Sequence, residues 1–76
     1  MQALNARQEK LLTLFKSAVE SEREAQETYR RMLFFSDDPT IRLIIEEFIG
    51  EEMRHEDKLI EMYNDLRNTK EFKKPV

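Results

Sequence analysis

The stretch Phe35-Ser36-Asp37-Asp38-Pro39 decides the fold, because it is the clearest break in a chain of 76 residues that otherwise favours helix. Helix-forming Glu, Arg, Lys, Leu and Met are frequent on both sides of it, and the chain has a single Gly. Asp38 followed by Pro39 is typical of a helix with an acidic N-cap and a proline at its first position. The sequence therefore predicts two helices joined at this stretch.

The two predicted helices should form one hairpin domain. Asn5 stands three residues before Gln8, a pair that resembles a capping box and marks the start of the first helix. Because the connection is short, the helices should be antiparallel neighbours. Residues 68–76, with the sequence NTKEFKKPV, lack helical periodicity and predict a flexible C-terminal tail. The predicted ranges are 5–35 and 39–67 for the helices and 5–67 for the all-α hairpin domain.

Each predicted helix carries a row of side chains at spacings of three and four, which places them on one face that should meet a partner helix. In the first helix the row is Leu11, Phe15, Ala18, Glu22, Ala25, Tyr29 and Met32. In the second helix it is Ile41, Ile45, Phe48, Glu52, His55, Leu59, Met62 and Leu66. Two helices cover only part of such faces, and a chain this short without disulfides is marginal as a monomer. We therefore expect two hairpins to dimerise into a four-helix bundle, with higher even-numbered homo-oligomers allowed.

The composition excludes several classes of protein. Thirteen basic and sixteen acidic residues give a formal net charge of -3, without the basic excess typical of nucleic-acid binding. The absence of Cys excludes disulfide-stapled and zinc-finger proteins. No apolar run approaches the roughly 18–20 residues of a membrane helix, and the start MQALNARQEK has no apolar signal region. We expect a cytoplasmic protein that binds neither nucleic acid nor membrane.

Three ionisable residues lie within the apolar rows, where an unpaired charge is costly. Glu22 and Glu52 are each fifteen positions from Asp37, so an antiparallel hairpin should place them at about the same height. His55 follows Glu52 by three positions, one turn along the same face. The three side chains should therefore converge in the middle of the bundle.

A second hairpin would double this set to four carboxylates and two imidazoles. Such a set suits two iron or manganese ions, because carboxylates are hard ligands that can bridge and imidazole binds first-row metals. It is the ligand set of di-iron carboxylate bundles, with Glu-x-x-His on two of the helices. Two alternatives stay open: His55 as a hydrogen-bonded core histidine, and helices rotated so that Glu22 and Glu52 face water.

Other polar residues near these rows have less specific interpretations. Tyr29 is expected to pack in the core, with a hydrogen bond to a metal-bound carboxylate as the alternative. Glu51 and Glu56 flank the row, where such residues are usually solvated, although one could line an entry path for iron. Seven further acids fall on faces expected to be solvated: Glu20, Glu24, Glu27, Glu46, Glu47, Asp57 and Glu61.

Two stretches, AVESEREAQETY and EEFIGEEMRHEDKLIEMY, resemble the ferritin-like superfamily and, within it, the rubrerythrin-type helix pair. The resemblance covers roughly Leu11 to Leu66, and its discriminating elements are Glu22 seven residues before Tyr29 and the run Glu52-Met53-Arg54-His55. Rubrerythrins carry two such helix pairs in one chain, and this chain has one. It is therefore most similar to the encapsulated ferritins, whose di-iron centre assembles between two subunits.

The resemblance implies a ferroxidase that oxidises Fe(II) to Fe(III) for iron storage or detoxification. It also implies that Glu22, Glu52 and His55 bind iron and are catalytic, that Glu52 bridges the two ions, and that an encapsulin shell is a partner and a location. Oxygen and peroxide stay open as oxidants, as do iron and manganese as metals. The alternatives are a non-catalytic structural or protein-interaction hairpin and a metal-storage protein without turnover.

Overall fold

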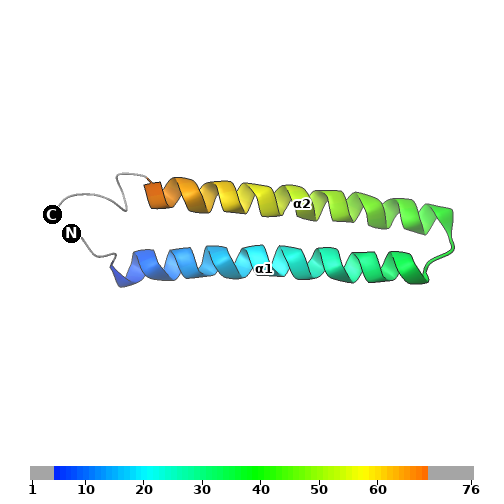
Figure 1. Cartoon of the computed structure of the whole chain (residues 1–76), viewed down its shortest axis with the longest axis horizontal. Helices are drawn as coiled ribbons and strands as arrows, with labels where there is room; N and C mark the ends of the chain where they lie inside the picture. The colour runs from blue at the N-terminus through cyan, green and yellow to red at the C-terminus, as the bar shows by residue number, and fades with distance from the viewer. Residues whose placement is uncertain (1–4, 69–76) are drawn as a thin grey trace.

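The computed structural model describes residues 5–68, which form two long antiparallel α-helices side by side (Figure 1). Helix α1 spans Ala6–Phe35 and helix α2 spans Pro39–Asn68, with 30 residues in each. The predicted all-α hairpin is therefore confirmed, and both helices agree with the predicted bounds to within one residue. The predicted tail comprises residues 68–76; Asn68 is instead the last residue of α2, and residues 69–76 lie outside the described residues.

Side-chain caps begin both helices where the sequence predicts them. The Asn5 side chain accepts a hydrogen bond from the Gln8 backbone N–H at 2.8 Å, and the Gln8 side chain accepts one from the Asn5 N–H at 3.1 Å. At α2, Asp38 Oδ1 accepts from the backbone N–H groups of Thr40 at 2.8 Å and Ile41 at 3.1 Å. These bonds satisfy amides that have no partner within the helix, and each cap typically stabilises it by about 1 kcal/mol.

Arg42 closes the opposite end of α1, beside the turn. Its guanidinium Nη1 donates to the carbonyl oxygen of Leu33 and, at 2.8 Å, to that of Ser36. Leu33 lies in the last turn of α1 and Ser36 is its C-cap, where backbone carbonyls lack the N–H donors that follow in the middle of a helix. A cation there also interacts favourably with the helix dipole. The side chain therefore ties the start of α2 to the end of α1 and shapes the short connection.

One side of the hairpin is closed by the two helices themselves. We define the closed side by two rows at seven-residue spacing: Leu12, Val19, Gln26 and Leu33 of α1, and Arg42, Ile49, Glu56 and Tyr63 of α2. Every one of these residues is buried or half-buried. Among the described residues, Leu12 and Ile45 are the buried hydrophobic ones, at 7% and 3% exposure. The core is thin because two helices have no further layer to cover them.

The other side is left open. We define the open face by the residues one position earlier in each row: Leu11, Ala18, Ala25 and Met32 of α1, and Ile41, Phe48, His55 and Met62 of α2. The two alanines are half-buried and the other six residues are exposed. The rings of Tyr29 and Phe48 lie 5.6 Å apart, and Met32 and Ile41 line one shallow groove, so both rows lie on the same side of the hairpin.

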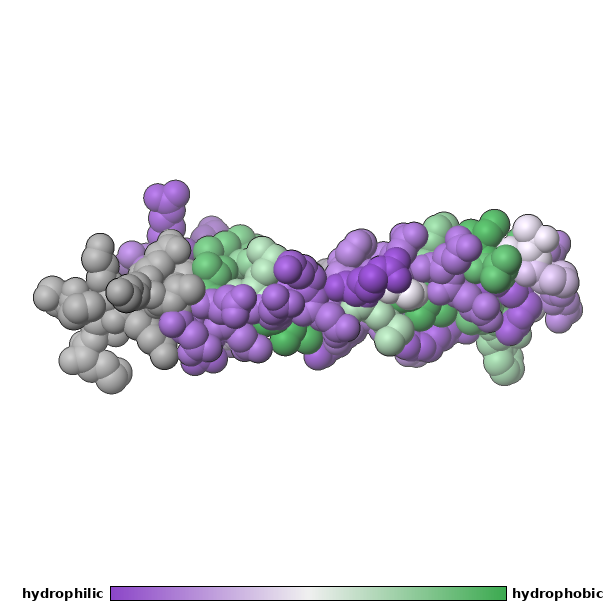
Figure 2. All heavy atoms as spheres, turned by 90° about the horizontal axis from the view of Figure 1, so that it is seen from above, coloured by the Kyte–Doolittle hydropathy of each residue, from purple (hydrophilic) through white to green (hydrophobic). Residues whose placement is uncertain are grey.

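Six residues that the sequence placed against a partner helix are thus uncovered within the hairpin: Leu11, Met32, Ile41, Phe48, His55 and Met62. Adjacent positions in a helix are about 100° apart, so a single neighbouring helix cannot cover both rows. Figure 2, which looks down on α2, shows hydrophobic residues at the surface in separate groups with hydrophilic residues between them. Over the described residues, neither helix contains a stretch hydrophobic enough to span a lipid bilayer.

Candidate metal centre

Three ionisable side chains meet near the middle of the hairpin. Glu22 projects from α1, while Glu52 and His55 project from α2, one turn apart. One ligand atom of each residue lies within 4.8 Å of the other two. The structure therefore brings together all three residues that the sequence singled out, and their roles as metal ligands and catalytic residues stay predictions.

The distances within this cluster are longer than those of ordinary hydrogen bonds. His55 Nδ1 lies 3.6 Å from Glu22 Oε2 and 3.7 Å from Glu52 Oε2, whereas an N–H···O bond is typically about 2.7–3.2 Å long. Ligand atoms that share one metal ion, each about 2.0–2.2 Å from it, are roughly 3–4 Å apart. The two distances from His55 Nδ1 therefore lie in the range for ligands that share a cation and exceed the length of a direct hydrogen bond.

Glu22 supplies the clearest sign of an incomplete site. Its Oε2 atom is buried and has no hydrogen-bond partner within the part of the chain that the structure describes. A buried polar atom without a partner costs about 1–3 kcal/mol, and more when the group is charged. A cation placed between Glu22, Glu52 and His55 would remove this cost, so the donor set present here fits a metal ion.

The cluster is shielded on one side and accessible on the other. The side chains of Glu22 and Glu52 are 22% and 20% exposed, whereas that of His55 is 59% exposed and belongs to the open face. One hairpin therefore offers two carboxylates and one imidazole, with its accessible side turned toward the surface that the hairpin leaves uncovered. Two metal ions need more ligands than this one chain provides.

The neighbouring residues largely follow the sequence interpretation. The Tyr29 ring packs against Phe48 at 5.6 Å between centroids, which agrees with its expected packing role. Glu51 is exposed. All seven acids predicted to be solvated are exposed in the structure: Glu20, Glu24, Glu27, Glu46, Glu47, Asp57 and Glu61.

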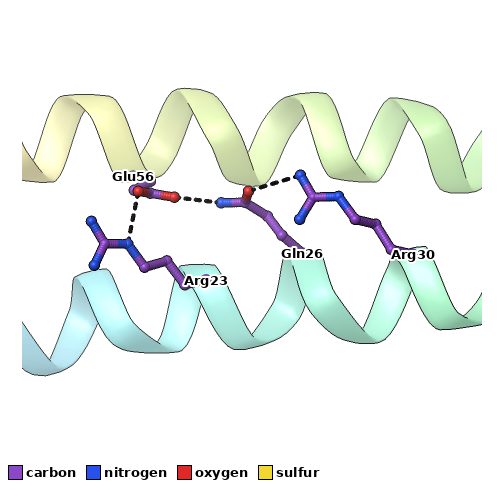
Figure 3. A network of polar contacts seen from close by, with 4 residues as sticks. All are labelled: Arg23, Gln26, Arg30 and Glu56. Atoms are coloured by element: carbon purple, nitrogen blue, oxygen red, sulfur yellow. Dashed lines mark hydrogen bonds and ion pairs between the residues drawn. The ribbon is translucent and has the colours of Figure 1, made fainter.

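Glu56 differs from the expected solvated residue. It is half-buried, and Arg23 Nε donates to its Oε2 at 2.9 Å while Gln26 Nε2 donates to its Oε1 at 2.7 Å (Figure 3). Arg30 in turn donates to Gln26 Oε1 at 3.5 Å. The hydrogen bond from Arg23, followed by that from Gln26, lowers the pKa of the Glu56 carboxyl below its ordinary value of 4.5.

Sequence reasoning missed this polar contact, although the spacing contains a signal for it. On a helix, the residues three and four positions after a given residue lie on the same face as it does. The residue that follows Glu22 in the row could therefore be the third or the fourth after it, and the same holds for Glu52. The third positions are Ala25 and His55, and the fourth are Gln26 and Glu56. The hairpin buries the fourth positions, because an amide and a carboxylate can satisfy each other across the helices.

Comparisons with protein-family models, with curated proteins and with solved structures gave no match. The ferritin-like resemblance therefore stays an expectation from the two quoted stretches. The geometry of Glu22, Glu52 and His55 is what supports a function for this chain.

Proposed function

We propose that this chain is a ferroxidase that oxidises Fe(II) to Fe(III) at a di-iron centre shared by two copies, with Glu22, Glu52 and His55 of each copy as ligands. One observation carries the proposal. The buried Glu22 Oε2 atom has no hydrogen-bond partner among the described residues, yet it lies within reach of Glu52 and His55. Such an arrangement is stabilised by a bound cation rather than by itself.

The open face supports the participation of a second copy. Large apolar residues, Phe48 and Met62, stand on α2 on either side of the exposed His55, and all three are exposed at the same heptad position. Five large apolar side chains exposed along one face, Leu11, Met32, Ile41, Phe48 and Met62, leave apolar area that a second helical layer could cover. In a two-fold dimer the same patch meets itself, so a ligand set on the patch is doubled. Two copies would offer four carboxylates and two imidazoles.

Each residue has a defined part in this proposal. Glu22 and Glu52 offer hard, anionic oxygens that balance the charge of the substrate iron, and Glu52 is the bridging ligand that the resemblance implies. His55 offers an imidazole nitrogen from the open side. Two Fe(II) ions give up one electron each, and oxygen takes up these two electrons with two protons to form hydrogen peroxide. The Fe(III) product then leaves for iron storage or detoxification, with an encapsulin shell as one destination.

A second candidate function is a structural or protein-interaction hairpin without catalysis. The observation that favours it is the position of His55 Nδ1 between the two carboxylates, at 3.6 and 3.7 Å. A protonated His55 would form ion pairs with both of them. In that case the cluster holds the hairpin together, and added iron has no binding site.

Anaerobic Fe(II) addition followed by exposure to oxygen distinguishes the two candidates. The proposed centre should bind about one iron per chain, and stopped-flow absorption should show rapid oxidation over repeated additions. Glu52→Leu should abolish the rapid phase, while the apo protein stays as stable or gains on the order of 1–4 kcal/mol. Glu47→Ala, on an exposed position of the same helix, is the matched control and should change neither property. Normal oxidation by a destabilised Glu52→Leu variant would contradict the ferroxidase.

A further inference from the structure

A polar bridge crosses between the helices beside the candidate metal centre. It consists of Arg23, Gln26 and Glu56, with Glu56 accepting one hydrogen bond on each carboxylate oxygen (Figure 3). Gln26 is 6% exposed and is the buried polar residue among those described. Bonds to an ionised carboxylate are stronger than bonds between neutral groups, and burial reduces their competition with water. The bridge is therefore a specific contact between α1 and α2.

The position of the bridge links it to the metal centre. Arg23 directly follows Glu22, Gln26 comes one turn after it, and Glu56 directly follows His55. Each member of the bridge is thus fixed to the same segment of helix as one of the candidate ligands. A shift of α1 against α2 that breaks the bridge would also separate Glu22 from His55.

Apolar packing alone does not fix the helices at this level. Among residues 5–68, the buried hydrophobic ones are Leu12 and Ile45. Leu12 is ten positions from Glu22 and Ile45 is seven from Glu52, which corresponds to about 15 Å and 10 Å along the helices. The bonds of Arg42 to the end of α1 lie beside the turn. Near the cluster, the half-buried contacts are supplemented by the directional hydrogen bonds of the bridge.

Resting on the proposed function, we propose that Arg23, Gln26 and Glu56 are positioning residues that hold Glu22 against Glu52 and His55 in the arrangement that binds metal. The bridge acts in two ways. It sets the relative placement of the helices. It also binds the guanidinium of Arg23, the residue after Glu22, whose Nε lies 2.9 Å from Glu56 Oε2. Arg23 is thereby kept away from the Glu22 oxygen that lacks a partner, which leaves that oxygen for a cation.

An exchange of the two polar partners tests this role. Gln26→Glu alone sets two carboxylates against each other, and Glu56→Gln alone removes the anion that Arg23 binds. The double variant Gln26→Glu/Glu56→Gln again places one amide and one carboxylate across the helices. Co(II) binding to the full-length apo protein, followed by visible absorption, should weaken about tenfold or more in each single variant. The double variant restores the amide–carboxylate contact but not the ion pair of Arg23 with Glu56, so Co(II) affinity should recover only in part and should exceed that of either single variant.

Ile45→Val is the control for stability. It thins the buried packing near the turn, away from the bridge, and should lower the melting temperature while leaving Co(II) affinity unchanged. If Ile45→Val weakens Co(II) binding as much as the single bridge variants do, affinity follows stability and the positioning role is wrong. Unchanged binding in all bridge variants also overturns it, while the metal site stands. A wild-type protein that binds no Co(II) overturns the proposed function itself.

Discussion

The closed side of this hairpin and the cluster beside its open face each contain a glutamate, and the two glutamates differ in their hydrogen bonding. On the closed side, both oxygens of Glu56 accept hydrogen bonds, from Arg23 and Gln26. At the cluster that borders the open face, Glu22 Oε2 is buried without such a partner among the described residues, and His55 Nδ1 lies 3.6 Å from it. The closed side is complete within one chain. The cluster at the open face is incomplete, and this difference points to groups that come from outside the hairpin.

The apolar residues show the same contrast. Each closed-side residue is buried or half-buried, whereas Met32, Ile41, Phe48 and Met62 of the open face are 40–49% exposed. The part of the chain that the structure describes, residues 5–68, forms two helices, and two helices cannot bury both faces. His55 belongs to the same open face as these exposed apolar residues. A partner that covers this face would therefore also cover the candidate metal ligands.

The largest expected effect comes from a charge on the open face. Ile41→Asp places a carboxylate on a surface that the proposed dimer buries twice, and like charges brought together there cost several kcal/mol. We expect the dimer to weaken by about a hundredfold or more, as measured by sedimentation at micromolar concentration.

Leu43→Asp is the matched control for this substitution. Leu43 is 59% exposed, lies two positions from Ile41 and belongs to neither face. It should leave the association unchanged. If both variants remain dimeric, the open face is not the dimer interface.

A smaller effect should separate the two glutamates. Glu22→Leu removes a buried oxygen without a partner and should stabilise the apo protein by about 1–3 kcal/mol in thermal or urea melts. Glu56→Leu should destabilise it, because Arg23 and Gln26 lose their common acceptor. Stability changes of opposite sign would support the contrast between the two glutamates. A loss of stability in both variants would contradict it.

Much of the fold could be predicted because its determinants are local. Asp38-Pro39 and the pair Asn5 and Gln8 specify caps through hydrogen bonds between neighbours in sequence, and the structure contains both. The meeting of Glu22 with Glu52 and His55 could also be anticipated, since antiparallel helices of known turn position bring equidistant residues together.

The rotation of the helices could not be predicted in the same way. Leu11 and Leu12 are both apolar, as are Phe48 and Ile49, so hydrophobicity alone does not say which residue of each pair faces the other helix. The structure half-buries or buries Leu12 and Ile49. The choice depends on contacts between residues about thirty positions apart, such as Gln26 with Glu56, which periodicity within one helix does not contain.

Acid should weaken the closed side through Glu56. Hydrogen bonds from Arg23 and Gln26 lower the pKa of Glu56 below 4.5, so its ionised form is favoured in the folded state. This contribution to stability is fully present above pH 4.5 and is lost as the pH falls through the lowered pKa. Apo melts from pH 6 down to pH 3 should therefore show a larger loss of melting temperature for wild type than for Glu56→Gln. Equal losses would mean that Glu56 gains nothing from its partners.

The smallest expected effect separates two arginines of α1. Arg31 lies 3.5 Å from Glu27 within the same helix, with both side chains more than half exposed, so Arg31→Ala should change stability by less than about 0.5 kcal/mol. Arg23 is also exposed but reaches across to Glu56 on α2, where its 2.9 Å bond supports the buried Gln26 contact. Arg23→Ala should therefore cost more stability than Arg31→Ala and should also weaken Co(II) binding, which Arg31→Ala leaves unchanged. Urea melts and Co(II) titrations of both variants measure this. If the two variants are indistinguishable, the contact of Arg23 with Glu56 contributes no more than an ordinary surface ion pair.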